Sequence, residues 1–127
     1  MKSALLRIQL AMTAFALLAL PDAAVAADAA AGKMKYDMFC AACHGATGKG
    51  DGPGAPPDPK PRDLSTGEFK FDTDGDGKSG TDADLKNVIR NGAAKYGGSP
   101  LMVAWPAGAV PDADVDNIIA YIRSLKQ

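Results

Sequence analysis

The segment CAACH at residues 40–44 dominates the interpretation of this sequence, because it places two cysteines one helical turn apart with a histidine directly after them. This Cys-x-x-Cys-His pattern is the attachment site of a c-type haem. The thiols of Cys40 and Cys43 would add to the two vinyl groups of haem, and His44 would be the proximal ligand of its iron. The chain has no other cysteine or histidine, so the pattern predicts a single, covalently attached haem c.

Redox-active thiols, a zinc site and a disulfide each account for less of this pattern. A redox-active pair of the thioredoxin type would need a βαβ setting, whereas the flanking sequence predicts a helix followed by a Gly-rich loop. A structural zinc site needs four ligands, and the motif supplies three. A disulfide would leave the adjacent histidine unexplained. A thiol or metal carrier therefore remains the alternative to haem attachment.

The amino terminus has the pattern of an export signal. Lys2 and Arg7 precede an apolar stretch at residues 10–20, and an Ala-Val-Ala cleavage site follows at residues 24–26. The apolar stretch is shorter than the ~20 residues that a membrane-spanning helix needs. We therefore expect a signal peptide over residues 1–26 that is cleaved after export to the bacterial periplasm.

The mature part of the chain, residues 27–127, is expected to form one small domain. Cleavage after Ala27 and a retained membrane anchor are the alternatives to this prediction. The full chain has 14 basic and 15 acidic residues and a net charge of −1. This balance argues against a nucleic-acid partner, which would require a clustered basic face.

Three segments have the apolar periodicity of helices, and no segment resembles a strand. The predicted helices span residues 29–41, 82–91 and 112–126. Thr81 and Asp84 resemble a capping box at the start of the second helix. The third helix has the clearest apolar stripe, formed by Val115, Ile118, Ile119, Ile122 and Leu125. The fold is therefore expected to be all-α, with the Gly- and Pro-rich segment 45–61 wrapped around the haem.

The iron needs a second axial ligand, for which histidine and methionine are the usual residues. Because His44 is the only histidine, a methionine is expected. Met34 and Met38 precede the motif on the same predicted helix and therefore belong to the proximal side. Met102 lies in a Gly- and Pro-rich loop that could carry it to the distal side, so we predict Met102 as the ligand. The alternative role for Met102 is to fill a gap in the core.

Several motifs in residues 27–127 resemble those of the bacterial class I, single-haem c-type cytochromes. These motifs are CAACHG at residues 40–45, PRDL at 61–64, GEFKF at 67–71, MVAW at 102–105 and the last helix with Tyr121. The resemblance implies a small all-α fold in which the first and last helices cross and loops enclose the haem. It also implies that Gly32 or Tyr36 packs near Tyr121 at this crossing.

The resemblance further implies roles for three residues around the haem. A proline carbonyl is expected to accept a hydrogen bond from the proximal His44, and Pro61 is the candidate, with Pro53 as the alternative. Arg62 is a candidate partner for a haem propionate. Trp105 is expected to pack against the haem ring.

The function implied by the resemblance is that of an electron carrier rather than an enzyme. Such a protein would be a periplasmic monomer without a membrane span, exchanging single electrons with transiently bound donor and acceptor proteins. A haem sensor or haem enzyme would need an open distal position, which Met102 would close. A fixed subunit of a larger redox complex is a further alternative.

An acidic segment, DTDGDG at residues 72–77, partly matches a calcium loop. Its aspartates and second glycine fit positions 1, 3, 5 and 6 of an EF-hand, but Ser79 and Ala83 occupy positions 8 and 12. We expect a surface turn, with weak calcium binding as the alternative.

Overall fold

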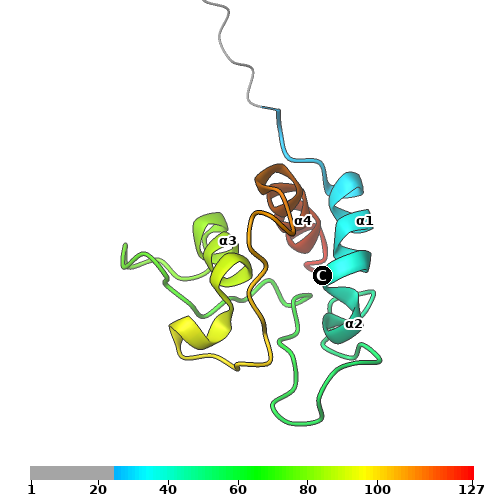
Figure 1. The fold of residues 1–127 in the computed structure, drawn as a ribbon, viewed down its shortest axis with the longest axis vertical. Coiled ribbons are helices and arrows are strands. Elements are labelled where there is room, and N and C mark those ends of the chain that lie inside the picture. The colour runs from blue at the N-terminus through cyan, green and yellow to red at the C-terminus, as the bar shows by residue number, and fades with distance from the viewer. Residues whose placement is uncertain (1–24) are drawn as a thin grey trace, which may run out of the picture.

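Helices form all of the regular structure in the computed structural model, which describes residues 25–127 (Figure 1). No strand occurs among these residues. The predicted signal peptide lies almost entirely outside the described residues. No helix in the described part of the chain is long and apolar enough to cross a membrane. In chain order the elements are α1 (Ala29–Phe39), α2 (Ala41–His44), α3 (Asp82–Asn91), the 3-10 helix η1 (Ala93–Tyr96) and α4 (Asp112–Ser124).

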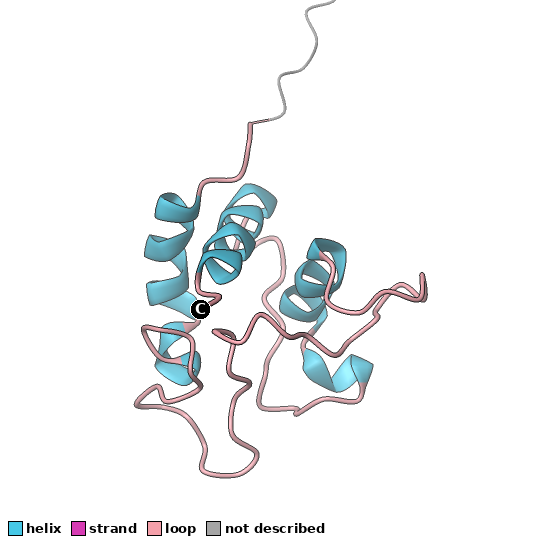
Figure 2. Ribbon diagram, turned by 180° about the vertical axis from the view of Figure 1, so that it is seen from behind, coloured by secondary structure: helices cyan, strands magenta, loops and turns pink. Residues whose placement is uncertain are grey.

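The all-α prediction is confirmed, with two differences in where the helices end. Helix α3 has the predicted bounds, and the capping box of Thr81 and Asp84 forms as expected. The first predicted helix stops at Phe39 and resumes after Cys40 as α2, so the CAACH segment occupies a helical turn of its own. Helix α4 ends at Ser124, two residues before its predicted end. Long loops connect α2 to α3 and η1 to α4 (Figure 2).

Helices α1 and α4 cross in close contact, as the resemblance to c-type cytochromes implied (Figure 1). Gly32 permits this approach, because a Cβ atom at this position would lie 1.8 Å from the carbonyl oxygen of Asn117. Tyr36 is completely buried at the crossing and meets the ring of Tyr121 edge-on, with 5.0 Å between the ring centroids. The backbone N–H of Asp28 donates a hydrogen bond of 2.7 Å to the side chain of Asn117 and joins the beginning of α1 to α4.

The core lies between α4, α3 and the inner side of α1. Four of the five residues in the predicted stripe of α4 are buried, and Leu125 is partly buried. Leu85 and Ile89 of α3 and Leu64 of the long loop pack into the same cluster. This arrangement leaves the loops and α2 to enclose the space between α1 and α3.

Candidate haem-binding site

A cavity of about 690 Å³ opens between α2, α3 and the long loops. Its volume is within the range of ~300–1,000 Å³ that is common for cofactor sites. Cys40, Cys43 and His44 line it together with Met102 and Trp105, and much of the remaining lining is apolar. Two thiols, one imidazole and one thioether in an apolar cavity are the donor set that haem c requires. The residues therefore fit this cofactor.

The imidazole of His44 is held in the tautomer that suits iron ligation. Its Nδ1 atom lies 3.1 Å from the carbonyl oxygen of Arg62. Because a carbonyl only accepts hydrogen bonds, Nδ1 carries the proton and Nε2 keeps its lone pair for a metal. Burial lowers the pKa of His44, against a smaller opposing effect of this hydrogen bond, so the neutral form is favoured.

The identity of this carbonyl corrects one prediction. We expected Pro61 to accept the hydrogen bond from His44, or Pro53 as the alternative, whereas the acceptor is Arg62. The carbonyl of Pro61 instead packs on the backbone of Gly50, where a Cβ atom would lie 2.3 Å from its oxygen. Pro61 still lines the cavity.

Cys40 and Cys43 are the candidate attachment sites, and the surroundings of Cys40 disfavour a thiolate ligand. Both are half-buried and free of a disulfide. Burial raises the pKa of the Cys40 thiol to about 12, which disfavours the thiolate that redox exchange or metal binding would need. A thioether bond removes the need to place a charge in this apolar surrounding.

Met102 is the only methionine among the described residues that lines the cavity. It is partly buried and contacts the core, whereas Met34 and Met38 are 65% and 68% exposed. The carbonyl of Met102 accepts a hydrogen bond of 3.1 Å from the backbone of Ala93, and its N–H donates one of 3.2 Å to the carbonyl of Ser99. These bonds fix the backbone from which its side chain extends.

Trp105 also lines the cavity, and its packing against a haem ring stays a prediction. Its indole meets the ring of Phe39 edge-on, with 5.2 Å between the centroids. Its backbone N–H donates a hydrogen bond of 2.8 Å to the carbonyl of Ile89. The residue is therefore held between α1 and α3, at the wall of the cavity.

Three cationic side chains are among the residues that line the cavity. Arg62 is exposed and lines the cavity, but its Nη1 atom already donates to the carbonyl of Glu68 at 2.9 Å. Four of its N–H donors remain for a propionate. Lys60 and Lys70 also line the cavity and were not singled out from the sequence. The available signal was that Lys60 directly precedes the PRDL motif and Lys70 lies within the GEFKF motif.

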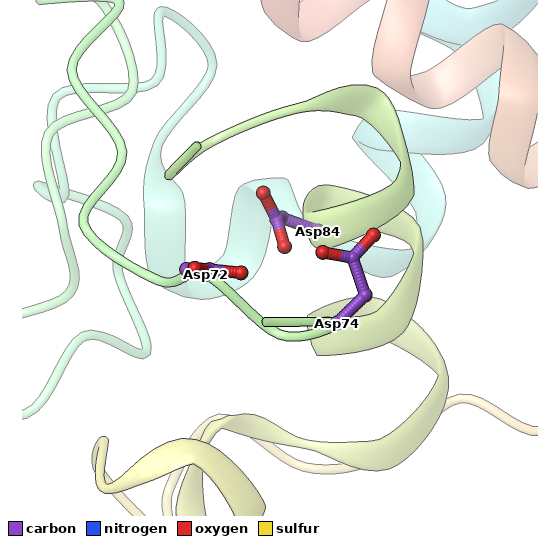
Figure 3. A group of neighbouring side chains, drawn as sticks. All are labelled: Asp72, Asp74 and Asp84. Atoms are coloured by element: carbon purple, nitrogen blue, oxygen red, sulfur yellow. The ribbon is translucent and has the colours of Figure 1, made fainter. Parts of the chain in front are cut away.

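The acidic segment forms the expected turn beside α3. Asp72 and Asp74 have carboxylate oxygens that lie within 4.8 Å of those of Asp84 (Figure 3). Asp84 is 1% exposed, and its two oxygens accept four hydrogen bonds of 2.6 to 2.8 Å from the N–H and hydroxyl groups of Thr73 and Thr81. These bonds hold the pKa of Asp84 far below its usual range. The carboxylate thus fastens the turn to the start of α3.

The chain is similar to known proteins over most of its length. The cytochrome c family model matches residues 29–126. Cytochrome c-554(547) of Halothiobacillus neapolitanus is 39% identical over 101 residues, which make up 80% of this chain and all of that protein. A solved structure of the Kuenenia stuttgartiensis reducing HAO-like protein complex Kustc0457/Kustc0458 is similar with a TM-score of 0.56 and 29% identity. That match covers 76% of this chain and 41% of the other.

The family match covers both the helices that cross and the residues that line the cavity. The 40–44 segment falls inside the matched range, as do Met102 and Trp105. The resemblance predicted from the motifs is therefore confirmed, and with it the expectation of a haem-binding, electron-transfer family. This chain belongs to the cytochrome c family.

Proposed function

We propose that this chain is a periplasmic electron carrier with one haem c attached to Cys40 and Cys43 and with His44 and Met102 as the axial ligands of the iron. One observation carries the proposal: residues far apart in the sequence, the CAACH segment and Met102, line the same apolar cavity. When bound, a haem iron supplies a reversible one-electron couple. The cytochrome c family, to which the chain belongs, transfers electrons in this way.

The side chains around the cavity support electron transfer rather than catalysis. The hydrogen bond from His44 to Arg62 orients the imidazole and raises its basicity as a ligand. Met102 would occupy the second axial position, and a closed ligand set leaves no place where a substrate could bind the metal. Histidine, the commonest general acid or base, occurs once and is committed to ligation. We therefore propose that the chain is not an enzyme.

The rim of the cavity offers a small apolar surface to redox partners. Leu101 and Val103, on either side of Met102, both line the cavity and are 57% and 55% exposed. Electron-transfer encounters use small, short-lived interfaces. Two exposed apolar side chains at the rim suit such an interface. The export pattern at residues 1–26 supports the periplasmic location, and the single CAACH segment supports a single haem.

The test is expression of the full chain in a bacterial host with haem-attachment machinery. The intact mass after denaturation should equal that of the processed chain plus one haem. The oxidised protein should show the near-infrared sulfur-to-iron band, and Met102→Ala should abolish it, while Met38→Ala, an exposed methionine outside the cavity, should retain it. A mass of the bare chain, or a spectrum unchanged by Met102→Ala, would contradict the proposal. Sustained turnover of peroxide by the wild-type protein would favour an enzyme instead.

A second candidate function is that of a fixed subunit in a larger redox complex. The likeness to a chain of a solved complex favours this candidate. The two candidates differ in the size of the native particle. Haem-stained native gels of the periplasmic extract should show a free carrier at the size of the monomer. Co-migration with a much larger haem protein after salt washing would support the subunit instead.

A further inference from the structure

Arg90, near the end of α3, contacts three groups on the segment that follows Met102. Its Nη1 atom donates hydrogen bonds to the carbonyls of Trp105, at 2.9 Å, and Val110, at 2.5 Å. Its Nη2 atom pairs with the carboxylate of Asp112 at the start of α4. The side chain is only 14% exposed. One guanidinium thus connects α3 to both ends of the irregular segment 105–111 and to the first residue of α4.

Backbone hydrogen bonds tie the same segment to the same end of α3. The N–H of Trp105 donates to the carbonyl of Ile89, and the carbonyl of Met102 accepts from Ala93. Gly92 packs directly under this carbonyl, where a Cβ atom would lie 3.0 Å from the oxygen of Met102. The backbone of residues 102–105 is therefore held at two points, and Arg90 supplies the attachment for the remainder up to α4.

We propose that Arg90 is a positioning residue that keeps the segment 102–110 against α3 and so sets how readily Met102 leaves the iron. This inference rests on the proposed function, because it takes Met102 as the axial ligand. A guanidinium suits the role, since its planar group of five N–H donors reaches two carbonyls and a carboxylate at once. A lysine at the same position would keep the charge but not the bridging geometry.

The energetic reason is that the hydrogen bonds of Arg90 are charge-assisted and largely shielded from water. The carbonyls of Trp105 and Val110 each accept from a cation, and losing one such bond corresponds to about a tenfold or greater change in an equilibrium constant. The loss would favour conformations in which the segment detaches from α3. Met102 would then dissociate more often, and an added ligand would compete for the iron more effectively.

The experiment compares Arg90→Met with two further variants of the haem-loaded protein. Arg90→Lys tests the bridging geometry and is the milder change if Arg90→Met folds poorly. Arg123→Met is the matched control, because Arg123 likewise donates to a carbonyl, that of Gly80, and pairs with the carboxylate of Asp82, without contacting segment 102–110. Each protein is titrated with imidazole while the near-infrared sulfur-to-iron band is followed. Hydrogen exchange at the amide of Trp105 is measured in parallel.

The expected result for Arg90→Met is imidazole binding at least about tenfold tighter than in the wild type, with exchange at Trp105 accelerated by a similar factor. For Arg90→Lys, the imidazole affinity and the exchange rate should lie between those of the wild type and of Arg90→Met. Arg123→Met should resemble the wild type in both measurements. Equal changes in Arg90→Met and Arg123→Met, or none in Arg90→Met, would refute the inference while Met102 ligation stands. A wild-type protein without the band would refute Met102 ligation itself, and this inference with it.

Discussion

Replacing Gly32 by alanine should force α1 and α4 apart. The new Cβ atom would lie 1.8 Å from the carbonyl oxygen of Asn117 and 2.4 Å from its carbonyl carbon. Cβ atoms essentially never approach other atoms within 3.0 Å, so the helices would have to separate by more than 1 Å. The backbone of α1 fixes the position of the Cβ atom, and its partner is a main-chain carbonyl, so no side-chain rotation can relieve the clash. The buried ring of Tyr36, one turn further along α1, would lose part of its packing.

Two effects of opposite sign determine the size of the change. Alanine favours a helix interior over glycine by about 1 kcal/mol. Overpacking costs about 1–3 kcal/mol and occasionally more, and a clash of a Cβ atom with a main-chain carbonyl belongs at the upper end of that range. We expect the free energy of unfolding to fall by about 2 kcal/mol in total. For a domain of this size the melting temperature would then fall by about 8–16 °C.

The assay is thermal unfolding of the haem-loaded protein followed by circular dichroism at 222 nm, a wavelength that reports helix content. Gly108→Ala is the matched control, because a Cβ atom there would meet nothing within 4 Å. This control should unfold within ~0.5 kcal/mol of the wild type. If Gly32→Ala and Gly108→Ala melted at the same temperature, the close crossing of α1 and α4 would be refuted.

Three further predictions concern hydrogen bonds and ions. Tyr36→Phe removes the bond of 2.8 Å from the buried hydroxyl to the carbonyl of Gly45 and should lower the free energy of unfolding by about 1 kcal/mol in denaturant titrations. Asp84→Asn should lower the melting temperature at neutral pH more than Thr73→Val does. The Asn variant removes the charge that accepts hydrogen bonds from both Thr73 and Thr81, whereas Thr73→Val removes only one hydroxyl donor. Since the pKa of Asp84 is lower in the folded than in the unfolded state, its contribution is present above about pH 4 and is lost as the pH falls further, so melting curves of wild type and variant should converge in acid. Calorimetric titration should detect no submillimolar calcium binding, and a tight site abolished by Asp74→Ala would contradict this.

Local signals in the sequence were sufficient to predict the helices that carry them. Helix α3 has its predicted bounds because Thr81 and Asp84 cap its start and Gly92 ends it with φ at 78°. The break after Phe39 was missed because neither proline nor glycine marks it. The N–H of Cys40 still bonds back to Tyr36, while the next turn starts a separate helix, and no local propensity in the sequence distinguishes this arrangement from a continuous one.

The sequence predicts those cavity residues whose side-chain chemistry marks them as haem-attachment sites or iron ligands. The cysteines and His44 follow from one motif, and Met102 follows from the scarcity of other ligands. The choice between the adjacent carbonyls of Pro61 and Arg62 depends on how Gly50 packs, which is a tertiary contact. The contacts of Arg90 span 15 to 22 residues along the chain and are likewise set by the fold rather than by any local pattern.

The contact between Asp28 and Asn117 has a consequence for the order of events when the protein is made. It joins positions 89 residues apart, so the crossing of α1 and α4 closes most of the described part of the chain into one loop. Contacts of such long sequence separation are slow to form, because the entropy of closing the chain is lost before the contacts compensate for it. The thiols of Cys40 and Cys43 are half-buried in the finished fold, and we expect them to be more exposed before this contact forms. With haem attached to these cysteines as proposed, we therefore expect attachment to precede closure, and a variant that closes faster should show a smaller haem-loaded fraction.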